Sequence, residues 1–394
     1  MPTPSAKKLV TALALTAASL ASVDGQAWAK EKADGVRAEP PVSRAPIDRV
    51  TRPAERLRFD RIVYIDAGKL FVSDPNGDNP RQLAGGLPHD ANAWQPVWSP
   101  DGTQVAFVAQ WFDQEHTKHR YELYTLDANG RNLRKQLAYD PSLYYGELRG
   151  VSWLDRHTLV VGYGKKHGFG QSVDWGLYTL ALNSRNPQPL DGVANGNTAW
   201  PAVSPDGKSI AYEYRASTQH HWKVRVVDRD TGQDRPLTTS GYGEQRHPRW
   251  SPDGQRLTFH KKWGSDTQVY LIDADGTGQQ QLTWPDPDDN ALTPAEDSFD
   301  ASWAPDGESL LMVRRVDGYG GLVELDLVSG ETIAFEVQDS HIKTPSFNPR
   351  YAGPVVQTSE RPQRVERNRP QRPIEVNGRD RVVVPAEPAP RRRR

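Results

Sequence analysis

The sequence repeats the tetrapeptide Ser-Pro-Asp-Gly, or a close variant of it, behind a large apolar residue. The copies read Trp-Ser-Pro-Asp-Gly at 98–102, Val-Ser-Pro-Asp-Gly at 203–207, Trp-Ser-Pro-Asp-Gly at 250–254 and Trp-Ala-Pro-Asp-Gly at 303–307. Within each copy, proline pre-sets its own φ and glycine supplies a position with positive φ, which predicts a tight turn. The copies recur at about 50 residues or twice that, and a repeat of this length is typical of a propeller or a solenoid.

Each turn is followed by the same succession of short strand patterns. An alternating apolar segment comes first, then a second strand, a turn of the type Asp-Ala-x-Gly and a last short strand containing Gln-Leu. In one repeat these segments lie at 104–108, 122–126, 127–130 and 136–137. The alternating segment recurs at 209–213, and the three later segments recur at 268–272, 273–276 and 281–282. With the strand that carries the Trp, each repeat has four short strands, which is the composition of a propeller blade.

Two irregular repeats set the number of blades. The segment at 151–156 lacks the Pro and Gly, yet strand patterns resume at 158–161 and 175–180, so we count it as a blade. The first repeat begins at Arg61 without a preceding Trp segment, and Phe347 near the C-terminus occupies a matching slot. Pairing the two would leave no open sheet edge. The sequence therefore predicts an all-β fold, a six-bladed β-propeller of four-stranded antiparallel blades, closed by the C-terminal strand completing the first blade.

The two ends of the chain differ from the repeats. Residues 1–29 have a basic start, an apolar stretch at 9–20 and an Ala-x-Ala site at 27–29, which predicts a signal peptide. We expect a flexible linker at 30–58, the propeller at 59–350 and a disordered Arg/Pro-rich tail at 351–394. The chain has no Cys, which excludes disulfides, thiolate metal sites and a Cys-linked lipid anchor. We expect a periplasmic or secreted protein.

Charge is unevenly distributed along the chain. Residues 359–394 hold eleven Arg against five acidic residues, about +6, whereas 61–358 come to about −10. An acidic body disfavours nucleic acid, because that affinity comes largely from neutralising phosphates. The apolar stretch of the leader is too short for a bilayer-spanning helix, which needs about 20 residues, so we expect no membrane span.

The repeat resembles a known family. Trp-Ser-Pro-Asp-Gly, the Ile-Ala-Phe-like strand, Asp-Ala-Asp-Gly at 273–276 and Gln-Leu-Thr at 281–283 are similar to the TolB-type β-propeller repeat. The resemblance implies the fold. It implies little about activity, because such repeats occur in Tol system periplasmic proteins, in propellers of prolyl oligopeptidase-like peptidases and in certain polysaccharide lyases. The chain has neither a G-x-S-x-G motif nor room after the repeats for a hydrolase domain, and only a short polar segment precedes them where TolB carries an α/β domain.

Strand order separates two faces. The Pro-Asp-Gly turns form a short, uniform rim, where we interpret Asp and Gly as turn formers. The opposite face should carry long loops, where function concentrates. Those loops are rich in aromatic residues and His, at 111–120, 163–169, 220–222 and 260–263. Polar and aromatic residues leading into the innermost strands should surround the channel mouth and bind a ligand: Trp94, Arg149, Trp200, Arg246, His247, Asp300 and Lys343.

These observations favour a non-catalytic, exported propeller that binds a protein or peptide partner through the long-loop face. No nucleophile–base pair or metal motif is evident, so we assign no catalytic residue, metal ligand or cofactor, and we expect a monomer. The alternatives are a lyase or hydrolase acting on an anionic saccharide, or a glycan-binding lectin, using a His/Arg/Trp site at the channel mouth. Lyase chemistry would need at least two or three of His89, His247 and His341 to converge with Arg246.

Overall fold

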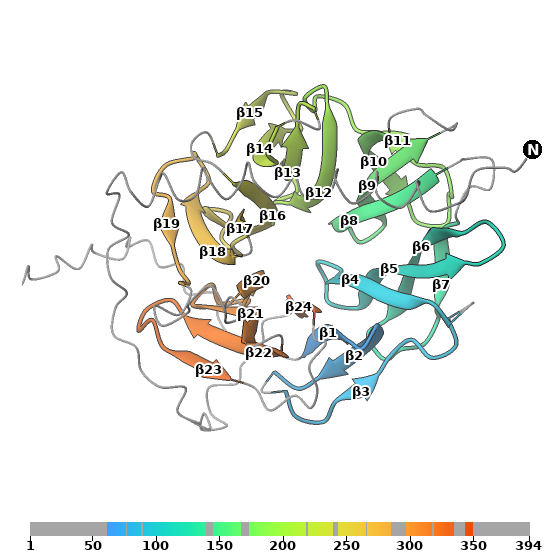
Figure 1. Cartoon of the computed structure of the whole chain (residues 1–394), viewed down its shortest axis with the longest axis horizontal. Coiled ribbons are helices and arrows are strands. Elements are labelled where there is room, and N and C mark those ends of the chain that lie inside the picture. Colours follow the sequence, from blue (N-terminus) through green and yellow to red (C-terminus); the bar gives the residue numbers. More distant parts are fainter. Residues whose placement is uncertain are drawn as a thin grey trace, which may run out of the picture. The chain divides into compact units, whose positions relative to one another are not determined.

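The computed structural model is a closed ring of six four-stranded antiparallel sheets (Figure 1). It describes residues 61–349 except 76, 88–89, 139–144, 167–172, 218–219, 239–242, 265, 285–296, 317–318 and 335–342. The predicted leader, linker and tail lie outside the described residues. Among the described residues there is no helix long and apolar enough to cross a membrane. The predicted fold class is confirmed.

Each blade runs from the channel outward in chain order. Blade 1 is the exception, because its innermost strand comes from the C-terminal part of the chain. The strands of blades 1 to 3 are β24 (Lys343–Phe347), β1 (Ile62–Asp66), β2 (Lys69–Ser73) and β3 (Arg81–Gln82); β4 (Asn92–Trp98), β5 (Gln104–Asp113), β6 (Lys118–Asp127) and β7 (Arg134–Leu137); and β8 (Tyr145–Asp155), β9 (Thr158–Lys166), β10 (Asp174–Ala181) and β11 (Gln188–Pro189). Those of blades 4 to 6 are β12 (Asn197–Val203), β13 (Ser209–Arg215), β14 (Lys223–Asp228) and β15 (Asp234–Pro236); β16 (Glu244–Trp250), β17 (Arg256–Trp263), β18 (Asp266–Asp273) and β19 (Gln280–Gln281); and β20 (Asp297–Trp303), β21 (Ser309–Val316), β22 (Tyr319–Asp326) and β23 (Thr332–Ala334).

The Pro-Asp-Gly segments are turns between the first and second strands, as predicted. In blade 2, Ser99 Oγ donates to Asp101 Oδ1 at 2.6 Å and the backbone N–H of Thr103 donates to the same oxygen at 3.1 Å. Gly102 closes the turn with φ of 64°, in the left-handed region that favours glycine. Asp and Gly are therefore held inside the turn by local hydrogen bonds, which supports their interpretation as turn formers.

The apolar core lies between neighbouring blades. One buried cluster joins Val63 and Leu70 of blade 1 to Val105 and Phe107 of blade 2. In four blades the innermost strand carries a Trp at or near its end, which packs across the same boundary and also donates a hydrogen bond there. The Nε1 of Trp98, Trp153, Trp250 and Trp303 donates to a carbonyl on the innermost strand of the preceding blade, at 2.9–3.1 Å.

The ring closes where the sequence predicts. β24 pairs antiparallel with β1, with Phe347 opposite Ile62. The Asn348 backbone N–H donates to the Arg61 carbonyl at 2.8 Å, and Trp98 of blade 2 donates to the Ser346 carbonyl. Blade 1 is thus complete only when both ends of the propeller meet.

The predicted long loops are shorter than expected. Residues 111–120 were expected as a loop, but β5 and β6 extend into it, so that Trp111 pairs with Arg120 and Asp113 with Lys118. His260 and Trp263 likewise lie within β17. Alternating apolar residues mark only the inner half of these strands, and backbone pairing carries them further than the pattern reaches. Residues 167–169 of another predicted loop lie outside the described residues.

Candidate functional site

Every innermost strand is interrupted by an irregularity near the middle of the channel. In blades 2 to 6 the ladder to the second strand shifts register across two intervening residues. At that point in each of the six blades one residue has a left-handed backbone. These residues are Gln95, Gly150, Trp200, His247, Asp300 and Thr344, with φ between 46° and 85°. Only one of them is glycine, and a left-handed non-glycine residue costs on the order of 1–3 kcal/mol, so the surrounding structure must hold it there.

All seven predicted ligand-binding residues lie at these irregularities. Trp94, Arg149, Arg246 and Lys343 come directly before the left-handed residue, whereas Trp200, His247 and Asp300 are themselves left-handed. The prediction that they lead into the innermost strands was wrong, because they lie within β4, β8, β12, β16, β20 and β24. A bulge re-aims side chains locally, which explains how strand residues can face the channel rather than only a neighbouring blade.

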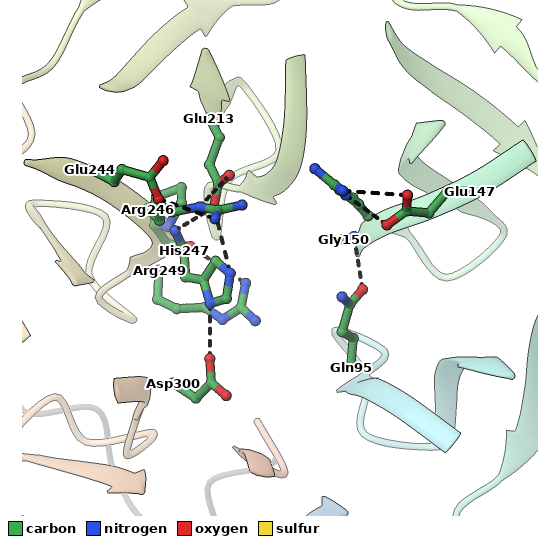
Figure 2. Close-up of polar contacts among 11 residues, drawn as sticks. Gln95, Glu147, Gly150, Glu213, Glu244, Arg246, His247, Arg249 and Asp300 are labelled. Atoms are coloured by element: carbon green, nitrogen blue, oxygen red, sulfur yellow. Dashed lines mark hydrogen bonds and ion pairs between the residues drawn. The ribbon is translucent and has the colours of Figure 1, made fainter. Parts of the chain in front are cut away.

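A polar network links blades 4, 5, 6 and 1 across this ring. Glu213 of β13, fully buried, accepts a hydrogen bond from the His247 backbone N–H at 2.9 Å and one from Arg246 Nε at 3.1 Å. His247 Nδ1 lies 2.9 Å from Asp300 Oδ1, and Asp300 Oδ2 accepts from the Thr344 N–H at 3.3 Å. Figure 2 shows His247 between Glu213 and Asp300. The carboxylates therefore fix both the strained backbone and the imidazole.

A second group of contacts joins blades 2, 3 and 1. Gln95 Oε1 accepts from the Gly150 N–H at 2.8 Å (Figure 2). Arg149 Nε donates to Glu147 at 2.7 Å, and its guanidinium lies 4.3 Å from the ring centre of Trp175. Lys343 Nζ lies 4.5 Å from the ring centre of Trp94. The cationic residues of the mouth are thus each held against an acid or an aromatic ring.

The rings of Trp200, His247 and His260 pack together beside the Asp300 carboxylate in the buried part of the site. The Trp200 and His247 rings are stacked, with centroids 3.5 Å apart, and the His260 ring lies 4.2 Å from that of His247. Burial lowers the pKa of His247 and of His260 well below the usual value, so both imidazoles are neutral at neutral pH. Burial also raises the pKa of Asp300 and of Glu213.

Arg246 keeps its charge despite its environment. Burial alone would lower its pKa, but Glu213 and Glu244 raise it above the ordinary value. The guanidinium also lies 5.4 Å from the ring centre of Trp222, which is buried. A fixed cation with carboxylates on one side and an indole nearby is suited to an anionic or aromatic group of a ligand.

These residues surround a cavity of about 370 Å³. Its walls include Trp94, Tyr121, Arg149, Trp200, Arg246 and His247, from blades 2 to 5. A separate cavity of about 450 Å³ lies at the Asp101 turn, beside Arg156 and His157. Only the first is lined by buried ionisable groups, and we take it as the candidate site.

Sequence reasoning missed several members of the site. His260 was expected in a loop, yet it lies on β17 opposite Arg246. Glu213 was interpreted as an ordinary strand residue. It follows an apolar segment that predicts a buried strand, and an acid in such a segment indicates that a cation lies nearby to pair with it. Nothing about a Gln at position 95 indicated that it would belong to the site. His89 and His341 lie outside the described residues, so their convergence with His247 stays a prediction.

Comparison with known proteins places this arrangement among TolB-type propellers. An uncharacterized protein of Agrobacterium fabrum is 25% identical over 249 residues, which cover 60% of this chain and 77% of that protein. The Tol-Pal system protein TolB of Anaeromyxobacter dehalogenans is 29% identical over 160 residues, 40% of this chain and 33% of that protein. The chain thus matches about a third of the length of that TolB relative.

A solved structure shows the same fold. The crystal structure of TolB from Acinetobacter baumannii superposes with a TM-score of 0.56 at 17% identity, covering 74% of this chain and 67% of that one. The family model described as TolB beta propeller domain matches residues 174–385, more than half of the chain. The chain belongs to the TolB beta propeller domain family.

Proposed function

We propose that this protein is a non-catalytic, exported propeller that binds a peptide segment of a protein partner at the channel mouth. The observation that carries the proposal is the cavity of about 370 Å³ walled by Trp94, Trp200, Arg149 and Arg246. Aromatic faces beside held guanidiniums are typical of protein recognition sites, where Trp, Tyr and Arg supply most of the binding energy.

One residue of the cavity wall has an unsatisfied hydrogen-bond donor. Trp94 Nε1 is buried and has no hydrogen-bond partner among the described residues. A buried N–H without a partner is costly, and a turn of the Trp94 ring towards the cavity would let a carbonyl or carboxylate oxygen of a bound segment satisfy it. Arg149, with a side chain 32% exposed, is positioned to meet the same segment. The site therefore favours a segment that carries an acidic side chain or a terminal carboxylate.

The relatives, the predicted leader and the size of the cavity support a protein partner rather than a small substrate. TolB relatives are described as Tol-Pal system proteins, which fits assembly with other proteins. The leader predicted at 1–29 supports export to the periplasm or the exterior. The cavity accommodates only a few side chains, so a larger partner would insert one extended segment and leave the rest of its surface outside.

Site-specific cross-linking tests this proposal. A photoreactive side chain at Tyr121, which lines the cavity, should form a cross-link with a partner in an envelope extract, whereas one at Val328, 87% exposed, should not. The product should disappear in Trp94→Ala and Arg149→Glu, and persist in Phe112→Ala, an exposed aromatic outside the cavity wall. Equal cross-linking from Tyr121 and Val328, or a product unaffected by Trp94→Ala, would overturn it.

One observation favours the enzymatic alternative enough to test it. Neutral His247 beside Asp300 and the fixed Arg246 resembles a base, its orienting carboxylate and an anion-holding cation. If the protein depolymerised an anionic saccharide, and His247→Ala abolished that activity while Phe112→Ala preserved it, this function would replace partner binding.

A further inference from the structure

The network contains a group of donors that the proposed function does not require. His247 of β16, His260 of β17 and Asp300 of β20 each offer one ligand atom, and these atoms lie within 4.8 Å of one another. Two imidazoles and one carboxylate are a ligand set that proteins use for Zn²⁺ and other divalent transition metals. Because the three residues come from blades 5 and 6, these two neighbouring blades have to pack against each other for the group to form.

One nitrogen of this group is without a partner. His260 Nδ1 is buried and has no hydrogen-bond partner among the described residues. An unsatisfied buried polar atom in a native site calls for an explanation, and an ion is one of the few. His260 also contributes one of the three clustered ligand atoms.

One pair of donors is already close to the separation that a metal requires. His247 Nδ1 and Asp300 Oδ1 are 2.9 Å apart. Two donors about 2.0–2.1 Å from a tetrahedral Zn²⁺ would lie roughly 3.3 Å apart, so this pair would separate by a few tenths of an ångström, and His260 would move to complete the group. The ion would take the place of the proton between His247 and Asp300, and that proton would move to His247 Nε2. Glu213 Oε1 lies 3.6 Å from Nε2, so the two would have to approach further to form a hydrogen bond.

The residues around the donors provide the support that metal-binding histidines usually have. Such histidines direct their second nitrogen to a carboxylate, as His247 would to Glu213. The Trp200 ring, stacked at 3.5 Å, fixes the plane of the His247 imidazole. His247 and Asp300 are both held in left-handed backbone conformations, φ 52° and 54°, that only a supporting structure maintains.

The local charge balance tolerates a dication. Arg246 and Arg249 lie close enough to His260 to disfavour its protonation, and they would also repel a metal. Against them stand the carboxylates of Glu213, Glu244 and Asp300, which pair with or face these guanidiniums. With both Arg charged and all three acids ionised the group carries −1, so a divalent ion changes it only to +1.

We infer that His247, His260 and Asp300 bind a divalent transition-metal ion such as Zn²⁺, with at least one coordination position left to solvent or a ligand. His247 also lines the cavity, so the ion would lie at its wall. The sequence alone had led us to assign no metal ligand, and this inference departs from that assignment. The metal site can be tested without the proposed protein partner, because the experiment uses the metal ion alone as the probe.

Calorimetric titration of the chelator-treated full chain with Zn²⁺ tests the site. We expect equimolar binding that Ca²⁺ and Mg²⁺ do not reproduce, since neutral imidazoles favour transition metals over these hard cations. Losing a group that merely supports a ligand weakens metal affinity roughly 10–100-fold, so His260→Asn and Asp300→Asn should each weaken it by at least that much. The control is His116→Asn. His116 Nδ1 lies 2.8 Å from Asp113, a similar His–Asp pair, but the His116 side chain is 51% exposed. Within the part of the chain that the structure describes, no third donor completes a group there.

Absence of stoichiometric binding, or equal loss in His116→Asn and His260→Asn, would overturn the inference. Because His260 is buried, its replacement can also disturb folding, so X-ray absorption of the Zn²⁺-loaded wild-type protein gives a second readout. Two imidazoles and a carboxylate oxygen at about 2.0–2.2 Å are expected. A shell of oxygen ligands alone would exclude these residues. Retained cross-linking at Tyr121 in a variant that no longer binds Zn²⁺ would leave the proposed function standing and separate the two ideas.

Discussion

At the scale of single residues, Glu213 holds the candidate site together. It is fully buried, yet it accepts hydrogen bonds from Arg246 and from the strained backbone of His247. Burial raises the pKa of this carboxyl, and the Arg246 charge opposes that shift. A buried acid kept at such a position contributes to geometry more than to stability, because desolvation consumes much of what the ion pair gains.

Glu213→Gln should nevertheless destabilise the protein clearly, because it leaves Arg246 without its buried ionic partner. Removing one partner of a buried ion pair costs about 3–5 kcal/mol, and we expect the lower end because Gln still accepts from the His247 N–H. Glu244→Gln is the matched control, since Glu244 pairs with the same Arg246 at 3.4 Å but is 31% exposed. Its loss should cost less than about 1 kcal/mol. Denaturant unfolding followed by Trp fluorescence measures both, and equal effects would contradict the central place given to Glu213.

At the scale of elements, the Pro-Asp-Gly turns predict a response to acid. In the blade 4 turn, Ser204 Oγ and the Lys208 N–H donate to Asp206 at 2.6 and 3.0 Å, which lowers the pKa of this carboxyl. The folded state then holds the proton less tightly than the unfolded chain. Its contribution is present above the unfolded-state pKa of about 3.9 and is lost as pH falls through the lower folded-state value.

Substitution tests that sign. Asp206→Asn should be less stable than the wild type near neutral pH, and the difference should shrink as pH falls below about 4. Ser204→Ala removes the hydrogen bond from Ser204 to Asp206. The stability of this variant should therefore depend less on pH in the acid range than that of the wild type. Thermal melts across this pH range measure both variants. A difference that grew on acidification would mean that the carboxyl does not stabilise the turn.

The turns were predictable because their information is local. Pro, Asp and Gly specify the backbone within five residues, and the following Ser-Ile-Ala-Tyr segment specifies a strand. The Trp positions before the turns were predictable for the same reason. The closure of the ring was predictable because one repeat, the first, lacks the strand that carries this position. Where the Trp position holds another residue, a Ser of the preceding blade supplies the hydrogen bond between the two blades. Ser152 Oγ accepts from the Val203 N–H, and Ser302 Oγ accepts from that of Phe347.

The chemistry of the channel was only partly predictable. Trp200 and His247 lie on innermost strands, and nothing in a Trp or a His indicates that its backbone is left-handed there. His260 escaped because its position depends on how far the β17 ladder extends and on the register that sets it opposite Arg246. Contacts such as Glu213 with His247 join residues of different blades, and a single sequence fixes their order around the ring but not their distances.

At the scale of the whole molecule, the propeller is stable only as a closed ring. Blade 1 takes β24 from a point more than 270 residues after β1, and Phe347 of β24 is buried with Ile62, Tyr64 and Leu311. Its slot lies between blades 6 and 1, where the two ends of the repeat region meet. Closing so long a loop carries an entropic cost, which the packing at this boundary has to offset.

Phe347→Ala should therefore weaken the entire fold rather than one blade. Deleting a buried Phe side chain costs about 3–5 kcal/mol, and here the deletion also loosens the strand that protects the edge of β1. An opened ring exposes that edge to pairing with other chains. We expect a lower midpoint in denaturant unfolding, together with aggregation at temperatures where the wild type stays monodisperse by light scattering. Val328→Ala, at an 87% exposed position, should change neither. A Phe347→Ala protein that lost only local protection at blade 1, with an unchanged global midpoint, would show that the ring stays closed without this contact.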